Sequence, residues 1–124
     1  MKKFMCLLLL VGIAAVSGAC GSRGSAASEI NINIATRVVE ITDEFLESNI
    51  SAQTARNRID ALAPIDTSTT ENADENSANS TLSHRVLMLR LDLGMMARNG
   101  TPEIYNRVLE ERNALARELG IRRR

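Results

Sequence analysis

Apolar residues recur between positions 34 and 62 in alternating steps of four and three. Eight of the nine positions in this series are apolar, and Ser48 is the polar exception. Such spacing places the side chains on one face of an α-helix. The pattern predicts one long amphipathic helix over 29–63, ended by Pro64, because the residue before a proline is pushed out of helical geometry. The series consists of Ile34, Val38, Ile41, Phe45, Ser48, Ala52, Ala55, Ile59 and Leu62.

The middle of this apolar stripe is made of small side chains. Ser48, Ala52 and Ala55 follow one another at helical spacing. Small residues let another helix approach closely, and we expect a partner helix at this point. The alternative is that the middle of the stripe packs only weakly.

The chain then becomes polar. From Asp66 to Asn79 only two alanines interrupt a run of acidic residues, asparagines, serines and threonines. Such a segment has too little apolar surface to bury a face. We therefore expect a disordered linker over 64–79.

Residues 80–124 carry the pattern of a helical hairpin. Ser80 or Thr81 can cap a helix whose apolar positions again follow four-three steps. Gly100 suits the end of that helix, while Thr101 and Pro102 suit the start of the next. The short break predicts two antiparallel helices. The apolar positions of the first are Leu82, Val86, Leu89, Leu93 and Met96.

Together these elements predict an all-α fold, a three-helix bundle of one long helix and an antiparallel hairpin. The long helix would extend past the hairpin, so we expect a second copy or a partner helix to cover the excess stripe. For each candidate contact, the alternative is packing inside the fold. The candidates are Ile34, Val38, Ile41, Phe45, Met88, Met95 and Met96.

The first 20 residues have the order of an export signal. Lys2 and Lys3 precede an apolar run over 4–16, which is too short to span a bilayer. Small residues and Cys20 follow, in the order Ser-Gly-Ala-Cys. This arrangement resembles the signal peptide of bacterial lipoproteins, in which the cysteine after the cleavage site receives the lipid, although Ser17 stands where that pattern prefers leucine.

The resemblance implies a signal peptide over 1–19 and a lipidated Cys20 at the head of a flexible tether over 20–28. The protein would then be anchored at the outer face of a bacterial membrane, facing the periplasm or the cell surface. A competing interpretation places the cleavage at the same peptide bond. An ordinary signal peptidase could cut after Ala19 and leave Cys20 as a free N-terminal thiol.

The charge differs between the two halves of the exported chain. Residues 20–79 carry 4 arginines and 10 acidic residues, whereas 80–124 carry 9 arginines and 5 acidic residues. Opposite charge predicts mutual attraction of the halves within one fold. The alternative is a basic end aimed at an anionic membrane or wall polymer through Arg122, Arg123 and Arg124.

Residue types needed for most chemistry are scarce. His84 is the single histidine, and no cysteine pair or phosphate-binding glycine loop follows the signal. A lone histidine near a helix start is more often a surface residue than a general base. The arginines lack interleaved aromatic residues, which argues against nucleic acid. We expect no enzyme activity, no cofactor and no metal.

These features predict an envelope lipoprotein that binds another envelope protein or a second copy of itself. One alternative is a small exclusion or immunity lipoprotein, which this chain resembles in size and anchor. Another is a secreted helical protein without a lipid.

Overall fold

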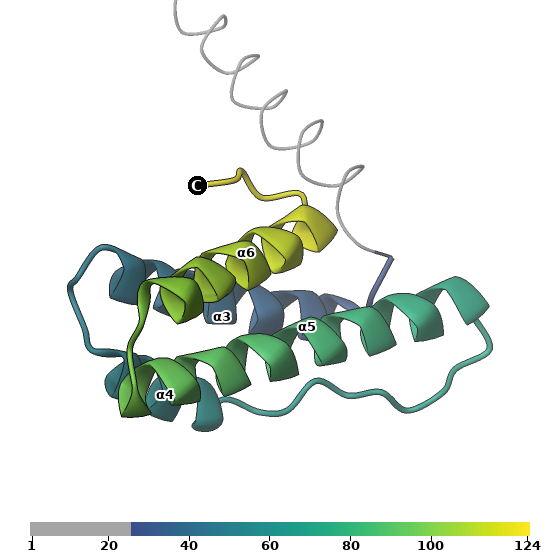
Figure 1. Ribbon diagram of the computed structural model, residues 1–124. Helices are drawn as coiled ribbons and strands as arrows, with labels where there is room; N and C mark the ends of the chain where they lie inside the picture. The colour runs from purple at the N-terminus through teal and green to yellow at the C-terminus, as the bar shows by residue number, and fades with distance from the viewer. Residues whose placement is uncertain (1–25) are drawn as a thin grey trace, which may run out of the picture.

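Four helices make up most of the part of the chain that the structure describes, residues 26–124 of this computed structural model (Figure 1). The predicted all-helical class is confirmed for these residues, which contain no strand. Cys20, the predicted signal peptide and residues 20–25 of the predicted tether lie outside them. The helices are α3 (Glu29–Leu46), α4 (Ala52–Asp60), α5 (Ala73–Arg98) and α6 (Pro102–Leu119).

The predicted single helix over 29–63 is wrong, because the chain turns between α3 and α4. Ser48 has a φ of 65°, in the left-handed region that rarely suits residues with a side chain. Ser51 then caps α4, its hydroxyl accepting a hydrogen bond from the N–H of Thr54 at 3.1 Å. The polar entry in the apolar stripe thus marks a turn rather than a weak point in a continuous helix.

The turn folds the second half of the stripe back into the same molecule. Ala52, Ala55 and Ile59 are buried, and α4 packs against both α3 and α5. The side chain of Arg56 on α4 lies over Gly94 of α5, where a Cβ would be 3.0 Å from its Nη1. The small residues do meet another helix, but it belongs to the same chain. The excess stripe that called for an external partner therefore does not exist.

The helix predicted to start at residue 80 begins two turns earlier. Asn72 is the N-cap of α5, its side chain accepting from the N–H of Glu75 at 3.0 Å. Asp74 and Glu75 lie in the first turn, where acidic side chains stabilise the helix dipole. The predicted linker over 64–79 is wrong for residues 73–79, and Ser80 and Thr81 lie inside the helix.

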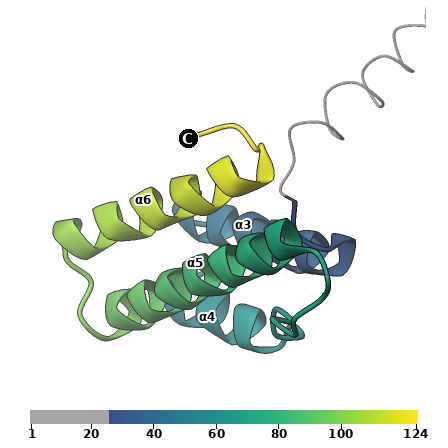
Figure 2. The ribbon, with the colours of Figure 1, turned by 90° about the vertical axis from the view of Figure 1, so that its right-hand side faces the viewer.

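The non-helical segment 61–72 runs below α5 in Figure 1, and Figure 2 shows it rising from the end of α4 to the start of α5. The fully buried Asn31 of α3 holds it: its side chain donates to the carbonyl of Asp66 at 2.7 Å and accepts from the N–H of Asp66 at 2.9 Å. The carboxylate of Asp66 accepts hydrogen bonds from the hydroxyl and from the N–H of Ser68. Both bonds lower the pKa of Asp66, and the bond from the hydroxyl has the larger effect. This buried amide, together with Leu62 and Ile65 packed against the core, fastens the segment to the helices.

Replacing that amide tests how the segment is held. Asn31→Ala leaves the N–H and carbonyl of Asp66 without their partner, and we expect a loss of about 1–3 kcal/mol in the free energy of unfolding. Faster proteolysis within 61–72 should accompany it. Asn33→Ala is the matched control, because Asn33 is exposed on the same helix. Equal losses in the two variants would contradict the role assigned to Asn31.

Two residues at the end of the predicted tether pack on the domain. Ala27 is buried, and Ser28 caps α3 while its own N–H donates to the side chain of Asn79 on α5 at 3.1 Å. The flexible tether predicted over 20–28 is therefore wrong for these last residues, which pack on the domain.

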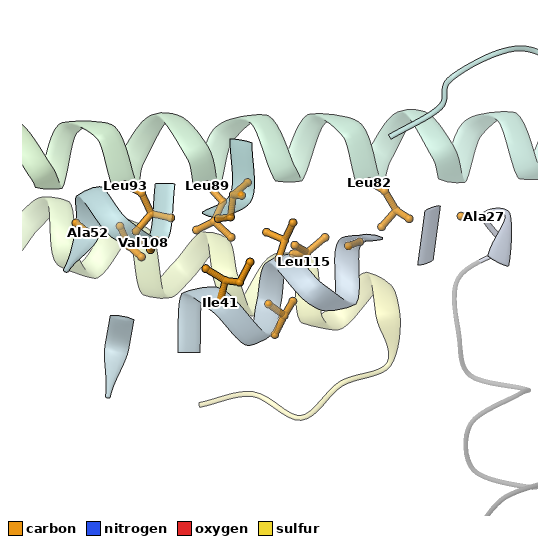
Figure 3. Close-up of a cluster of buried hydrophobic side chains, with 13 residues drawn as sticks. Ala27, Ile41, Ala52, Leu82, Leu89, Leu93, Val108 and Leu115 are labelled. Carbon is orange, nitrogen blue, oxygen red and sulfur yellow. The ribbon is translucent and has the colours of Figure 1, made fainter. Parts of the chain in front are cut away.

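The predicted hairpin of α5 and α6 is present. Thr101 caps α6, Pro102 occupies its first turn, and Gly120 ends it with a φ of 74°. Side chains from α3, α4, α5 and α6 meet in one core (Figure 3). Its largest buried apolar members are Ile41, Leu82, Leu89, Leu93, Leu115, Val38 and Val108.

Candidate functional site

A shallow groove with a mixed polar and apolar lining lies beside α5. It consists of two adjoining hollows, of about 260 and 190 Å³, that share Pro64, Ile65, Val86 and Arg90. We call it the α5 groove. Further lining residues are Ile34, Val38, Ile59, Asp60, Leu62 and Ala63 in the larger hollow, and Ser83 and Leu87 in the smaller one.

Three parts of the chain form its walls. The helix α3 supplies Ile34 and Val38, the end of α4 and the segment after it supply the residues up to Ile65, and α5 supplies Val86 and Arg90. The next residue after Ile65 is Asp66, whose main chain is held by Asn31. The position of the wall around Ile65 thus depends on that buried amide.

Asp60, which lines the larger hollow, pairs with Arg90 and also lies 3.8 Å from Nε of Arg56. Nε of Arg90 lies 2.7 Å from a carboxylate oxygen of Asp60, and both side chains are about 40% exposed. At this exposure solvent screens the pair, so it contributes little to stability. It places one positive and one negative group next to each other in the lining of the larger hollow.

Two leucines project from the same helix into solvent. Leu87 is 45% exposed and also lines the smaller hollow, and Leu91 is 49% exposed one turn further along α5. Single exposed leucines are ordinary, but two at adjacent turns beside a groove form an apolar surface. This surface and the α5 groove together are called the outer face of α5.

The predicted contact residues fall into different places. Ile34 lines the α5 groove, whereas Val38, which also borders it, is 1% exposed and belongs with Ile41 to the core. Phe45 packs its ring against Tyr105, with centroids 6.0 Å apart. Thus packing inside the fold accounts for Val38, Ile41 and Phe45.

The methionines divide in the same way. Met96 packs against the core, whereas Met88 and Met95 are half-buried on α5. Met88 directly follows the exposed Leu87 in the sequence. Among Met88, Met95 and Met96 it is therefore the residue next to the outer face of α5.

Two residues of the arginine cluster 122–124 make contacts with the helical domain. Arg124 lies 3.0 Å from Glu47 and 3.5 Å from Asp43, and its hydrogen bond to Glu47 raises its pKa. The carbonyl of Arg122 accepts a hydrogen bond from Arg112. Attraction between the two halves therefore accounts for Arg124, while Arg122 and Arg123 have exposed side chains.

Arg112 is at the centre of this charged network and was not singled out by the sequence pattern. Its buried guanidinium binds both carboxylate oxygens of Asp43, at 2.8 and 3.0 Å, the side chain of Asn113 and the carbonyl of Arg122. Asn113 in turn accepts from the N–H of Arg124 at 3.0 Å. The network fastens the C-terminal segment to α3 and α6.

The sequence pattern also missed the wall at 62–65 and the exposure of Leu87 and Leu91. A spacing of four between two leucines was a usable signal, since it puts both on one side of a helix. It could not tell which side faces solvent, because apolar residues surround most of α5.

Among residues 26–124 no cluster of histidine, cysteine and acidic side chains could hold a metal ion, and His84 is exposed. No helix in that range is long and apolar enough to cross a membrane. No protein family, curated protein or solved structure matches the chain.

Proposed function

We propose that this protein is a non-enzymatic lipoprotein of the bacterial envelope that binds another protein through the outer face of α5. A lipid on Cys20 would hold the helical domain at the outer face of a membrane. The observation that carries the binding role is the pair of exposed leucines beside the α5 groove. The anchor rests on the order of residues from Lys2 to Cys20.

The packing of the domain supports a binding role for this face in particular. Most other apolar positions of the long series are already covered by helices of the same chain. The exposed Ile30 stands alone on α3, with an exposed fraction of 71%. On the outer face of α5, a partner could therefore cover the exposed Leu87 and Leu91 and also fill the adjacent groove.

The anchor would lie close to the domain. Only five residues separate Cys20 from Ala26, a length that spans roughly 20 Å when fully extended. Because Ala27 and Ser28 pack on the domain, a lipid on Cys20 would restrict how far it can move from the membrane. Two acyl chains suffice for stable attachment, since each buried methylene contributes about 0.8 kcal/mol.

A direct test of the anchor compares the wild-type chain with Cys20→Ala. We expect the wild type, expressed in bacteria, to carry a lipid-sized increase in intact mass and to partition into the detergent phase. Cys20→Ala should show neither property. A wild-type protein that begins with an unmodified Cys20 and stays in the aqueous phase would contradict the anchor and favour the secreted alternative.

Binding to anionic surfaces is a weaker candidate. Arg122 and Arg123 are available, but Arg124 is already paired with Asp43 and Glu47. Each free basic residue near an anionic membrane contributes about 1 kcal/mol. Two such residues give a modest attraction beside a lipid anchor.

A further inference from the structure

We infer that residues 122–124 are a detachable strap, and that the site under this strap on α3 and α6 binds an extended, arginine-bearing segment of another protein. The strap is the short piece of chain that follows α6 and Ile121. The residues that hold it differ from those that line the α5 groove. The inference therefore concerns a second site and does not rest on the proposed function.

Two side chains of α6 bind the main chain of the strap. After α6 the chain reverses and runs back along this helix in both views (Figures 1 and 2). Nη1 of Arg112 donates to the carbonyl of Arg122 at 2.7 Å. The side-chain oxygen of Asn113 accepts from the N–H of Arg124 at 3.0 Å. An extended peptide offers a carbonyl and, two residues later, an N–H, so these two bonds recognise backbone rather than sequence.

One side chain of the strap adds a preference for arginine. Nη1 of Arg124 lies 3.0 Å from a carboxylate oxygen of Glu47 and 3.5 Å from one of Asp43. Guanidinium groups pair with carboxylates through charge-assisted hydrogen bonds, whereas a lysine offers only a point charge. The site therefore fits an extended segment whose arginine lies two residues after the carbonyl that Arg112 binds.

The site is formed without the strap. Arg112 is 4% exposed, and its Nε and Nη2 bind the two carboxylate oxygens of Asp43 at 2.8 and 3.0 Å. Neither bond involves the strap, so the guanidinium stays in place when the strap leaves. Its Nη1 then loses the carbonyl of Arg122, and Asn113, which is 7% exposed, loses the N–H of Arg124. Buried groups without partners are costly, so a peptide that restores both bonds is stabilised in this site.

The strap itself has few contacts. The buried apolar residues of the described chain all lie between Ala27 and Ala116, and the side chains of 122–124 are exposed. Ile121 remains with the helices, because its N–H donates to the carbonyl of Ala116 at 2.8 Å and its side chain packs against the core. Segments with few buried contacts open without unfolding of the domain. We therefore expect the strap to open and close while the helices stay folded.

Amide hydrogen exchange of the full chain tests the opening. The N–H of Arg124 should be protected because it donates to Asn113, but about a hundredfold less than the N–H of Leu115 inside α6. Equal protection at the two positions would show that the strap leaves only on global unfolding and would overturn the inference. Absence of any protection at Arg124 would show that the strap is not bound and would overturn it equally.

Peptide binding to the full chain tests the site. The probe is Ser-Ala-Ala-Arg-Ser with blocked ends, followed by the main-chain NMR signals at positions 112 and 113. Arg124→Glu places like charges beside Asp43 and Glu47 and should open the strap. The probe should saturate this variant at about one tenth of the concentration that the wild type needs, the ratio for a strap that leaves its site open a tenth of the time. Arg123→Glu is the matched control with the same change of charge at an exposed side chain, and equal binding to all three chains would overturn the strap.

Two further changes test the backbone recognition by itself. Methylation of the main-chain nitrogen of the arginine in the probe removes the N–H that Asn113 accepts, and should weaken binding to Arg124→Glu about tenfold. Asn113→Ala, added to Arg124→Glu, removes the acceptor instead, so the methylated and unmethylated probes should bind that chain equally. Circular dichroism verifies that each chain is folded. A methylated probe that binds Arg124→Glu as well as the unmethylated one would overturn the site.

The source of the ligand is tested by sedimentation of the Cys20→Ala chain, in which a lipid plays no part. The strap of a second copy carries the same arginine, but its three residues span only about 10 Å when extended. It would reach the site only if two α6 helices lay side by side, and we expect no dimer that depends on Arg124. A dimer that Arg124→Glu abolishes would assign the ligand to a second copy and overturn another protein as its source.

Discussion

Arg112→Met is expected to lower the free energy of unfolding by about 1.5–3 kcal/mol, the range for hydrogen bonds to a charged group. The loss stays below that of a fully buried ion pair because Asp43 is 22% exposed and keeps Arg124 at 3.5 Å. Arg112 is buried and supplies two hydrogen bonds to Asp43 and one to the carbonyl of Arg122. Its removal leaves these acceptors without that donor. Urea unfolding followed by circular dichroism measures the loss.

The matched control is Arg117→Met on the same helix. Arg117 is exposed and lies in the last turn of α6, so we expect a change within about 0.5 kcal/mol. Removing both partners of the buried pair, in Asp43→Leu with Arg112→Met, should cost less than the two single losses added together, because no charge is left unpaired. A loss for Arg112→Met as small as that for Arg117→Met would show that the network does not stabilise the domain.

Leu89→Ala is the second large effect, with an expected loss of about 2–5 kcal/mol. Leu89 is 0% exposed and belongs to the core cluster to which all four described helices contribute. Truncation removes apolar contacts and leaves a cavity that helices on every side must close. The same unfolding experiment measures this loss.

Leu91→Ala is an internal comparison for Leu89→Ala, since the same atoms are removed two residues away. Leu91 is 49% exposed, and we expect a loss below about 1 kcal/mol. Similar losses at the two positions would mean that α5 is rotated relative to the other helices. Unequal losses in the stated order would support the assignment of the outer face of α5, whatever partner covers it.

Several elements of the fold could be predicted because their signals are local. Thr101, Pro102 and Gly120 mark the ends of α6, and each acts through the few residues beside it. The start of α5 was also marked locally, by Asn72 as a cap and by Glu75 three residues later. The prediction placed that start at residue 80 because polarity was treated as evidence for disorder.

The candidate site was predicted less well, since exposure depends on packing. Ile34 and Ile41 belong to the same apolar series, yet one lines the α5 groove and the other is buried in the core. The spacing of the series says that they share a face, but not how much of that face other helices cover. Arg112 shows the same limit. Its buried guanidinium pairs with the carboxylate of Asp43 on α3, which lies 69 residues earlier in the chain.

By itself the sequence determined the helical class, the hairpin of α5 and α6, and the set of apolar side chains that had to be covered. These properties follow from helical periodicity and caps, which act within one or two turns. Only the tertiary structure decided that the first helix breaks at Ser48, that α4 folds back onto α5, and that Leu87 and Leu91 face solvent. The physical reason is that a left-handed serine is locally unfavourable, so the break persists because burial of Ala52, Ala55 and Ile59 against distant residues offsets its cost.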